Sequence, residues 1–126
     1  MDVANPARES EDHMKYVMFV CIDPSVKLDP AEAASIRPDA EAWVEEMDGR
    51  GVRVMGQALA PIEDATTVRL RRSEVVIADG PFAETKEQIG GFDILDCADL
   101  DEAIEVASKH PVARFGTLEL RPFVEG

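Results

Sequence analysis

The sequence has only two cysteines, only two histidines and little basic charge. Cys21 and Cys97 belong to no C-x-x-C pair and have no histidine at ligand spacing, which argues against a zinc site. The 13 Lys and Arg residues are outnumbered by 26 acidic residues, so the net charge of −13 would repel a phosphate backbone. We therefore expect no metal, no cofactor and no direct binding of nucleic acid.

Long apolar segments are also lacking. The longest wholly apolar run, residues 16–22, is far shorter than the ~20 residues that a membrane-spanning helix needs. No basic segment followed by an apolar core, as in a secretory signal, is visible at the N-terminus. These absences predict a cytoplasmic protein that does not enter membranes.

The 126 residues are predicted to hold one domain. Residues 1–13 contain almost no large apolar side chains, so we interpret them as a polar N-terminal extension. The domain itself then covers residues 14–126.

Apolar segments with a period of two predict the strands. Residues 15–22 are apolar on both alternations, as in a central strand that is covered on both faces. Arg72 and Ser73 are placed to form the turn of a hairpin that leads directly into Asp79. The remaining strands are predicted at residues 52–59, 67–71, 74–78, 92–97 and 115–121.

Capping signals predict the helices. Asp29 and Pro30 begin a short helical turn, which Pro38 interrupts, and a separate amphipathic helix follows over residues 39–49. Asp99 begins the last helix with a capping box, and Pro111 ends it. The predicted apolar stripes are Ala40, Trp43, Val44 and Met47 in the first amphipathic helix and Leu100, Ala103, Ile104 and Ala107 in the last helix.

The predicted order is strand, helix, strand, hairpin, strand, helix, strand. Two βαβ halves with right-handed crossovers fold most simply into a ferredoxin-like α+β domain, an antiparallel sheet with both helices on one face. The hairpin is inserted between the halves. The other face of the sheet needs a cover, which a two-fold homodimer packed sheet against sheet supplies.

Residues 79–91 are the most informative segment, because Gly-Pro and Gly-Gly bracket a polar loop. Asp79 is expected to accept hydrogen bonds from nearby backbone N–H groups, and Gly80 to adopt a positive φ. The loop supplies the carboxylates and the ammonium that proton transfer requires. The candidate ligand-binding residues are Asp79, Phe82, Glu84, Thr85 and Lys86, and the candidate catalytic residues are Asp79, Lys86, Glu87 and His110.

The same residues have purely structural interpretations. Asp79 as a turn cap and Lys86 as the partner of a surface acid account for the loop without chemistry. Phe82 is expected to anchor the loop against the body or a partner subunit. His110, just after the last helix, is expected to be protonated and to stabilise the negative helix end, and the alternative is a general base.

Two further groups are expected to be structural. Arg69, Arg71 and Arg72 are interpreted as a solvated strand end, with an anion site as the alternative. If the first strand pairs antiparallel with residues 92–97, Cys21 and Cys97 lie at opposite ends, ~17 Å apart. That separation excludes a disulfide between them.

The run ADGPFAETKEQIGGFDIL, residues 78–95, resembles the signature of the DGPF class of the YCII-related family of bacterial proteins. The resemblance covers residues 14–123 and implies a dimeric α+β barrel. It implies no reaction, because none is known for most members. Classical members have a proposed His–Asp pair, the histidine after an Arg-Pro and the aspartate before a proline that follows the second helix. In this sequence Asp39 follows Arg37-Pro38, and His110 precedes Pro111.

Two functional hypotheses follow, and the sequence leaves open whether the protein is an enzyme. The first is a homodimer that binds a small polar metabolite in a cleft beside residues 79–91, with lyase-like or isomerase-like acid-base chemistry. The alternative is a non-enzymatic regulatory or interaction module, which the resemblance would make accessory to an extracytoplasmic-function sigma factor.

Overall fold

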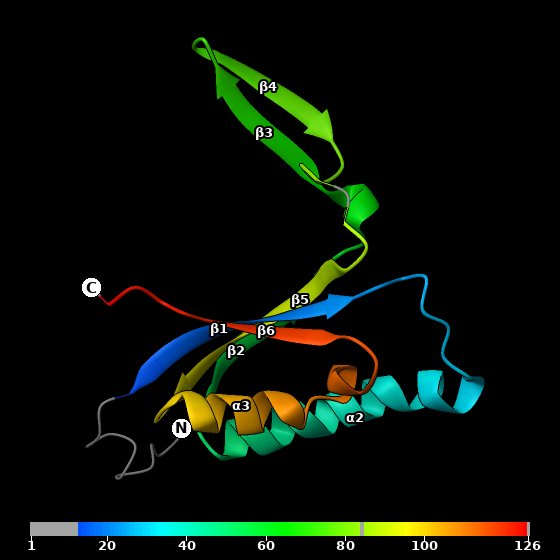
Figure 1. The fold of residues 1–126 in the computed structure, drawn as a ribbon, viewed down its shortest axis with the longest axis vertical. Helices are drawn as coiled ribbons and strands as arrows, with labels where there is room; N and C mark the ends of the chain where they lie inside the picture. The colour runs from blue at the N-terminus through cyan, green and yellow to red at the C-terminus, as the bar shows by residue number, and fades with distance from the viewer. Residues whose placement is uncertain (1–12, 84, 126) are drawn as a thin grey trace.

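A computed structural model describes residues 13–83 and 85–125 (Figure 1). Four strands form one antiparallel sheet in the order β2-β5-β1-β6. β1 lies in the interior of this sheet, as its sequence predicts. The strands are β1 (Met14–Ile22), β2 (Arg53–Ala58), β5 (Gln88–Cys97) and β6 (Thr117–Pro122). The predicted N-terminal extension, apart from His13, lies outside the described residues.

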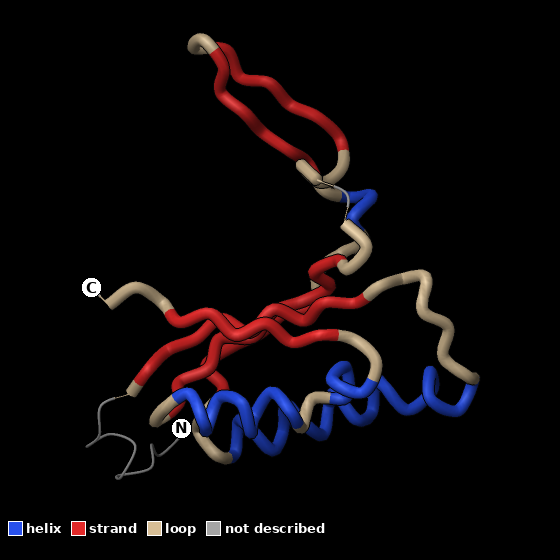
Figure 2. Tube along the Cα trace, viewed as in Figure 1, coloured by secondary structure: helices blue, strands red, loops and turns tan. Residues whose placement is uncertain are grey.

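Both long helices, α2 (Pro30–Gly49) and α3 (Leu100–Ser108), pack on the same face of the sheet (Figure 2). Met18 and Leu95 from the sheet and Met47 from α2 are fully buried between the two layers. This arrangement confirms the predicted ferredoxin-like α+β fold.

Helix α2 is one continuous helix, so the predicted break at Pro38 is wrong. Asp29 caps it as expected, because its carboxylate accepts a hydrogen bond from the Glu32 N–H at 2.8 Å. Proline removes one backbone donor, which leaves the carbonyl of Ala34 without its helical partner. Both Ala34 and Pro38 are exposed, so water is available to that carbonyl, and the packing of the following turns keeps the helix intact.

Helix α3 begins at the predicted capping box. Asp99 accepts a hydrogen bond from the Glu102 N–H, and the Glu102 carboxylate accepts one from the Ala98 N–H, each at 2.8 Å. The predicted apolar stripe is only partly correct, because Leu100 and Ile104 are half exposed. The helix buries the predicted Ala103 and Ala107 together with Val106, since the small alanines allow a close approach to the sheet.

Strands β3 (Thr66–Arg71) and β4 (Glu74–Asp79) form the predicted hairpin. Arg72 and Ser73 make its turn and have φ angles of 50° and 65°, the left-handed conformation of a two-residue type I′ turn. The hairpin projects from the sheet on the side away from the helices (Figure 1). It follows the short 3-10 helix η1 (Ile62–Asp64).

The face of the sheet opposite the helices is apolar over its centre and only partly buried, and its β6 edge carries Thr117, Glu119 and Arg121. Along β1, Tyr16, Met18 and Val20 are buried toward the helices, whereas the alternate residues remain partly accessible. We call this surface the open face. Its apolar members, from three neighbouring strands, are Val17, Phe19, Cys21, Met55, Phe92 and Ile94.

The register also separates the two cysteines. Cys21 pairs with Ile89, near the start of β5, whereas Cys97 pairs with Met14 at its other end. The prediction that these cysteines form no disulfide with each other is therefore confirmed.

Candidate functional site

The loop residues predicted to bind a ligand lie on the surface. Asp79 ends β4 with an exposed side chain, and Phe82, at 80% exposure, is not anchored against the body of this chain. Thr85 is also exposed, and its hydroxyl donates to the backbone carbonyl of Glu87. Glu84 lies outside the described residues. In the single chain, the described members of this set, Asp79, Phe82 and Thr85, are therefore open to solvent.

Asp79 does not cap the turn, contrary to the prediction. No described residue donates a hydrogen bond to its carboxylate. The turn is instead held through Gly80, whose N–H donates to the Ala65 carbonyl at 2.7 Å and whose carbonyl accepts from the Thr67 hydroxyl at 2.8 Å. The predicted positive φ of Gly80 is confirmed at 90°.

Lys86 and Glu87 have structural partners. The Lys86 ammonium lies 3.9 Å from a carboxylate oxygen of Asp23, although the lysine side chain is 84% exposed. The Glu87 carboxylate accepts a hydrogen bond from the Thr117 hydroxyl at 2.8 Å. These contacts support the structural interpretation of Lys86 and tie the end of the loop to the sheet.

A cavity of about 320 Å³ lies between α2 and the β2–β5 half of the sheet. We call it the inner cavity. Gly90 and Gly91, where the predicted loop runs into β5, form part of its wall. Most of the wall is apolar, and its polar side chains include Arg53, Asp93 and His110. The apolar contributors include Val20, Ile36, Ala40, Val44 and Val112.

Asp93 is a buried carboxylate in this wall, only 7% exposed. The Nε of Arg53 donates to its Oδ1 at 2.8 Å. Burial raises the pKa of Asp93, and the neighbouring guanidinium only partly opposes that shift. Asp93 is therefore held in a tuned environment, as is common for groups at functional sites.

Gly56 makes room for this carboxylate. It pairs with Asp93 across the two strands, and a Cβ at position 56 would lie 1.9 Å from the Asp93 Oδ1. No side chain fits there unless Asp93 moves. The sequence shows a glycine in a strand, but only the register reveals what it accommodates.

His110 is buried and lines the inner cavity, so the prediction of a protonated helix cap is wrong. Burial lowers the pKa of His110 to about 4, which keeps the imidazole neutral at pH 7. Its Nδ1 accepts a hydrogen bond from the Val112 N–H at 3.1 Å and caps the short 3-10 helix η2 (Pro111–Arg114). Nδ1 is thus an acceptor, and the ring hydrogen belongs on Nε2.

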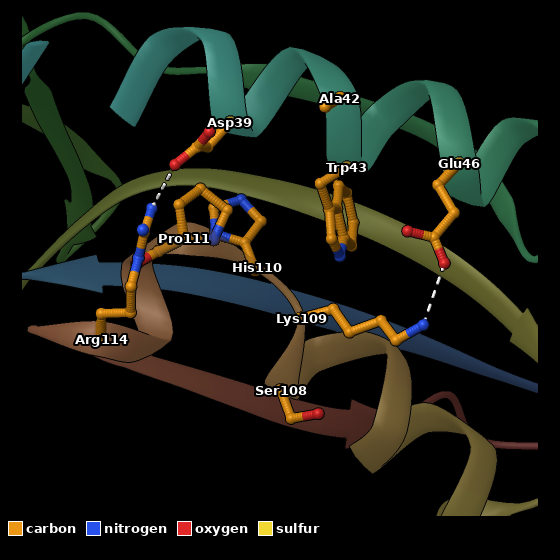
Figure 3. Close-up of a pocket in the computed structure, with 9 residues that line it drawn as sticks. All are labelled: Asp39, Ala42, Trp43, Glu46, Ser108, Lys109, His110, Pro111 and Arg114. Carbon is orange, nitrogen blue, oxygen red and sulfur yellow. Dashed lines mark hydrogen bonds and ion pairs between the residues drawn. The ribbon is translucent and has the colours of Figure 1, made fainter. Parts of the chain in front are cut away.

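His110 also lines a second, outer groove of about 350 Å³ between α2 and η2 (Figure 3). Asp39 pairs with Arg114 at 2.8 Å, and Glu46 pairs with Lys109 at 3.0 Å. These two ion pairs bridge the groove, and each charged side chain that lines it is paired with another. The outer groove is therefore well explained as the packed junction of helix and loop.

Sequence reasoning missed Arg53, Gly56 and Asp93. A signal for Asp93 was present, because it alternates with Leu95 and Cys97 on the apolar side of a strand. An acid in that series is unusual unless it is paired. No spacing in the sequence connects Asp93 to Arg53, since strand pairing brings them together.

Among the described residues, no three His, Cys, Asp or Glu side chains are grouped as metal ligands. Across the same part of the chain, no helix is both long and apolar enough to cross a membrane.

Comparison with known proteins identifies the family. The model of the YCII-related domain matches residues 14–125, nearly all of the chain. The protein belongs to the YCII-related family. This YCII-related chain is also 38% identical, over 98 residues, to an uncharacterised protein of Rhizobium meliloti (strain 1021). That match covers 64% of this chain and 79% of the other protein.

In this YCII-related domain, Asp39 and His110 occupy the positions that the resemblance gives to a histidine and an aspartate. The structure places both on the outer groove, so the two positions line one groove with the residue types exchanged (Figure 3). Asp39 is paired with Arg114, and Nδ1 of His110 is bonded to the backbone of Val112. Asp39 and His110 therefore do not form a hydrogen-bonded pair with each other through these contacts.

Proposed function

We propose that this protein binds a small metabolite in the inner cavity and that Asp93 exchanges a proton with it. The observation that carries the proposal is that a buried carboxylate and a neutral imidazole line the same, largely apolar space. A cavity with an apolar wall and a few polar groups is typical of small-molecule sites. The ligand class is a small molecule with an apolar body and one hydrogen-bonding group.

Each polar side chain has a role that follows from its contacts. Asp93 is the acid-base group, because burial raises its pKa toward the range in which proton transfer is efficient. Arg53 orients that carboxylate and balances its charge. His110, with a pKa of about 4, is a poor base and serves as a neutral hydrogen-bond donor through Nε2. Proton transfer of this kind corresponds to lyase-like or isomerase-like chemistry.

The test is a thermal-shift screen of a metabolite library, followed by calorimetric titration of each hit. A ligand at about 100 times its Kd stabilises the fold by about 2.7 kcal/mol, which such a screen detects. Asp93→Asn should weaken binding by about tenfold, because a charge-assisted contact is lost. Asp39→Asn in the outer groove is a matched control that should leave the affinity unchanged. A full screen without hits, or hits that bind Asp93→Asn normally, would refute the proposal.

We also propose that the protein is a homodimer in which the two sheets pack against each other. Support comes from the open face, whose apolar residues no described segment covers. Soluble monomers rarely expose a large apolar sheet. We expect an interface on the order of 1,600 Å² in total. Sedimentation equilibrium at low micromolar concentration should give about twice 13.8 kDa, and a single species of 13.8 kDa would exclude the dimer.

The loop residues keep a place in this proposal through the dimer. Asp79, Phe82, Thr85 and Lys86 face solvent in one chain, so they would reach a ligand only across a subunit interface. We further propose that the protein belongs to the DGPF class, comes from a bacterium and is located in the cytoplasm. Two thiols without a disulfide are in keeping with a reducing compartment.

The second candidate is a non-enzymatic regulatory module. The exposed Phe82 and the exposed loop around it favour this reading, because apolar side chains on a surface often mark protein contacts. A sigma-factor partner would then bind the loop. Purified sigma factor that binds Phe82→Ala as well as wild type would remove this candidate.

A further inference from the structure

One face of the hairpin β3–β4 is apolar beyond the Thr66–Asp79 pair at its base. Val68 is paired with Ile77 and Leu70 with Val75, so the four side chains point to the same side. Each of them is 64–65% exposed. The opposite face holds Arg69, Arg71 and Glu74 around Val76. We call the first surface the apolar arm face.

An arm of this kind is not stable without support. A two-stranded hairpin alone in water is marginal at best and needs a surface on which to pack its apolar side. The hydrogen bonds of Gly80 with Ala65 and Thr67 close its base but cover none of the apolar arm face. The well-formed strands and type I′ turn therefore indicate that another molecule supplies the missing surface.

The position of the arm favours a second copy of this chain. The hairpin rises on the same side of the sheet as the open face (Figure 1). A copy seated on the open face would lie beside the arm, so a single partner would cover both apolar surfaces. Under two-fold symmetry the contact is reciprocal, and each arm packs on the other subunit.

Charge supports the same partner. The arm carries Arg69, Arg71 and Arg72 against only Glu74 and Asp79, whereas the whole chain has a net charge of −13. The arm is thus a basic element on an acidic protein. Attraction between the arm of one copy and the acidic body of another offsets the repulsion that two such chains otherwise experience.

We propose that β3–β4 is an exchanged arm whose apolar face packs against a second copy of this chain. The proposal rests on the homodimer proposed above and adds that the hairpin of each subunit contacts the other subunit. Phe82, which follows the arm and is 80% exposed, is covered in the same contact.

Amide hydrogen exchange on the unmodified protein tests the arm directly. Peptides from residues 66–79 should be protected at concentrations where sedimentation shows a dimer, and should lose that protection when dilution gives monomers. A dimer in which these peptides exchange as fast as an unstructured segment overturns the arm proposal while the sheet-to-sheet dimer stands. A monomer at all concentrations overturns both. Binding at the inner cavity is measured separately and decides the metabolite proposal alone.

Substitutions at two neighbouring residues test whether the apolar arm face, rather than the opposite face, forms the contact. Ile77→Glu places a charge on the apolar arm face, and Val76→Glu places the same charge on the opposite face. Ile77→Glu should weaken dimerisation by about tenfold, while Val76→Glu should change it less than about twofold. Circular dichroism verifies that both variants fold. Equal effects of the two substitutions on the dimerisation affinity would contradict the proposal. So would an unchanged dimerisation affinity for Ile77→Glu.

Discussion

A Cβ on Gly56 would lie 1.9 Å from the Oδ1 of Asp93, far inside the 3.0 Å below which Cβ contacts essentially never occur. The same hypothetical atom would lie 2.8 Å from the backbone carbonyl of Phe92, which has little freedom to move. The absence of a side chain at Gly56 therefore leaves room for the Asp93 carboxylate, which accepts a hydrogen bond from Arg53. This relationship connects the stability of the sheet to the proposed site.

Gly56→Ala should lower the free energy of unfolding by about 2 kcal/mol, because the added methyl group overpacks the junction of β2 and β5. Chemical denaturation measures the change. Gly49→Ala is the matched control, since a Cβ there meets no atom within 4 Å and it ends α2 with a better helix former. The control should be neutral or slightly stabilising. Equal losses in both variants would argue against the Gly56–Asp93 relationship.

Thr67 rather than Asp79 should stabilise the base of the hairpin. Thr67→Val removes the hydroxyl that donates to the Gly80 carbonyl and should cost about 1 kcal/mol. Asp79→Ala should change the free energy of unfolding by less than about 0.5 kcal/mol, because its side chain is exposed. Urea titrations of both variants decide between the two residues. A larger loss for Asp79→Ala would restore its role as a turn cap.

Asp99→Ala should destabilise the protein by about 1 kcal/mol, because the first turn of α3 loses the acceptor for the Glu102 N–H. The ligand affinity should stay the same, since Asp99 does not line the inner cavity. Urea denaturation gives the first quantity and calorimetry the second. Asp101→Ala, in the same turn but outside the cap position, is the control. Weaker ligand binding at unaltered stability would assign Asp99 to a site instead.

His110 should make stability fall as the pH is lowered. The unfolded chain protonates this imidazole near pH 6.5, whereas the folded protein does so only near pH 4, because burial lowers the pKa. The unfolded state therefore binds more protons in that window, and the stability present above pH 6.5 is lost toward pH 4. The loss attributable to His110 is about 3 kcal/mol.

The measurement is the free energy of unfolding between pH 7 and pH 4.5. His110→Asn removes the titrating ring but keeps a side-chain acceptor that can cap η2. The difference between wild type and this variant isolates the histidine from Asp93, whose raised pKa acts in the opposite direction. Parallel pH profiles for the two proteins would show that His110 is protonated normally in the folded state.

Local signals in the sequence determined much of the fold. Periodicity placed the strands, the Asp99 cap began α3, and the turn at Arg72 and Ser73 set the hairpin, because each depends on residues close together in the chain. The break predicted at Pro38 failed for the same reason. A proline weakens its own turn, but the packing of Trp43 and Met47 decides whether the helix continues.

The candidate site was decided by the tertiary structure. The sequence pointed to residues 79–91, where polar groups are neighbours along the chain, yet Asp79, Phe82, Thr85 and Lys86 face solvent. Arg53, Asp93 and His110 are far apart in sequence and meet only because β2 pairs with β5 and η2 packs beneath α2. The sequence alone determined which residue types were available, whereas burial by the folded layers raises the pKa of Asp93 and lowers that of His110. Desolvation depends on every neighbour in three dimensions, and no spacing along the chain encodes it.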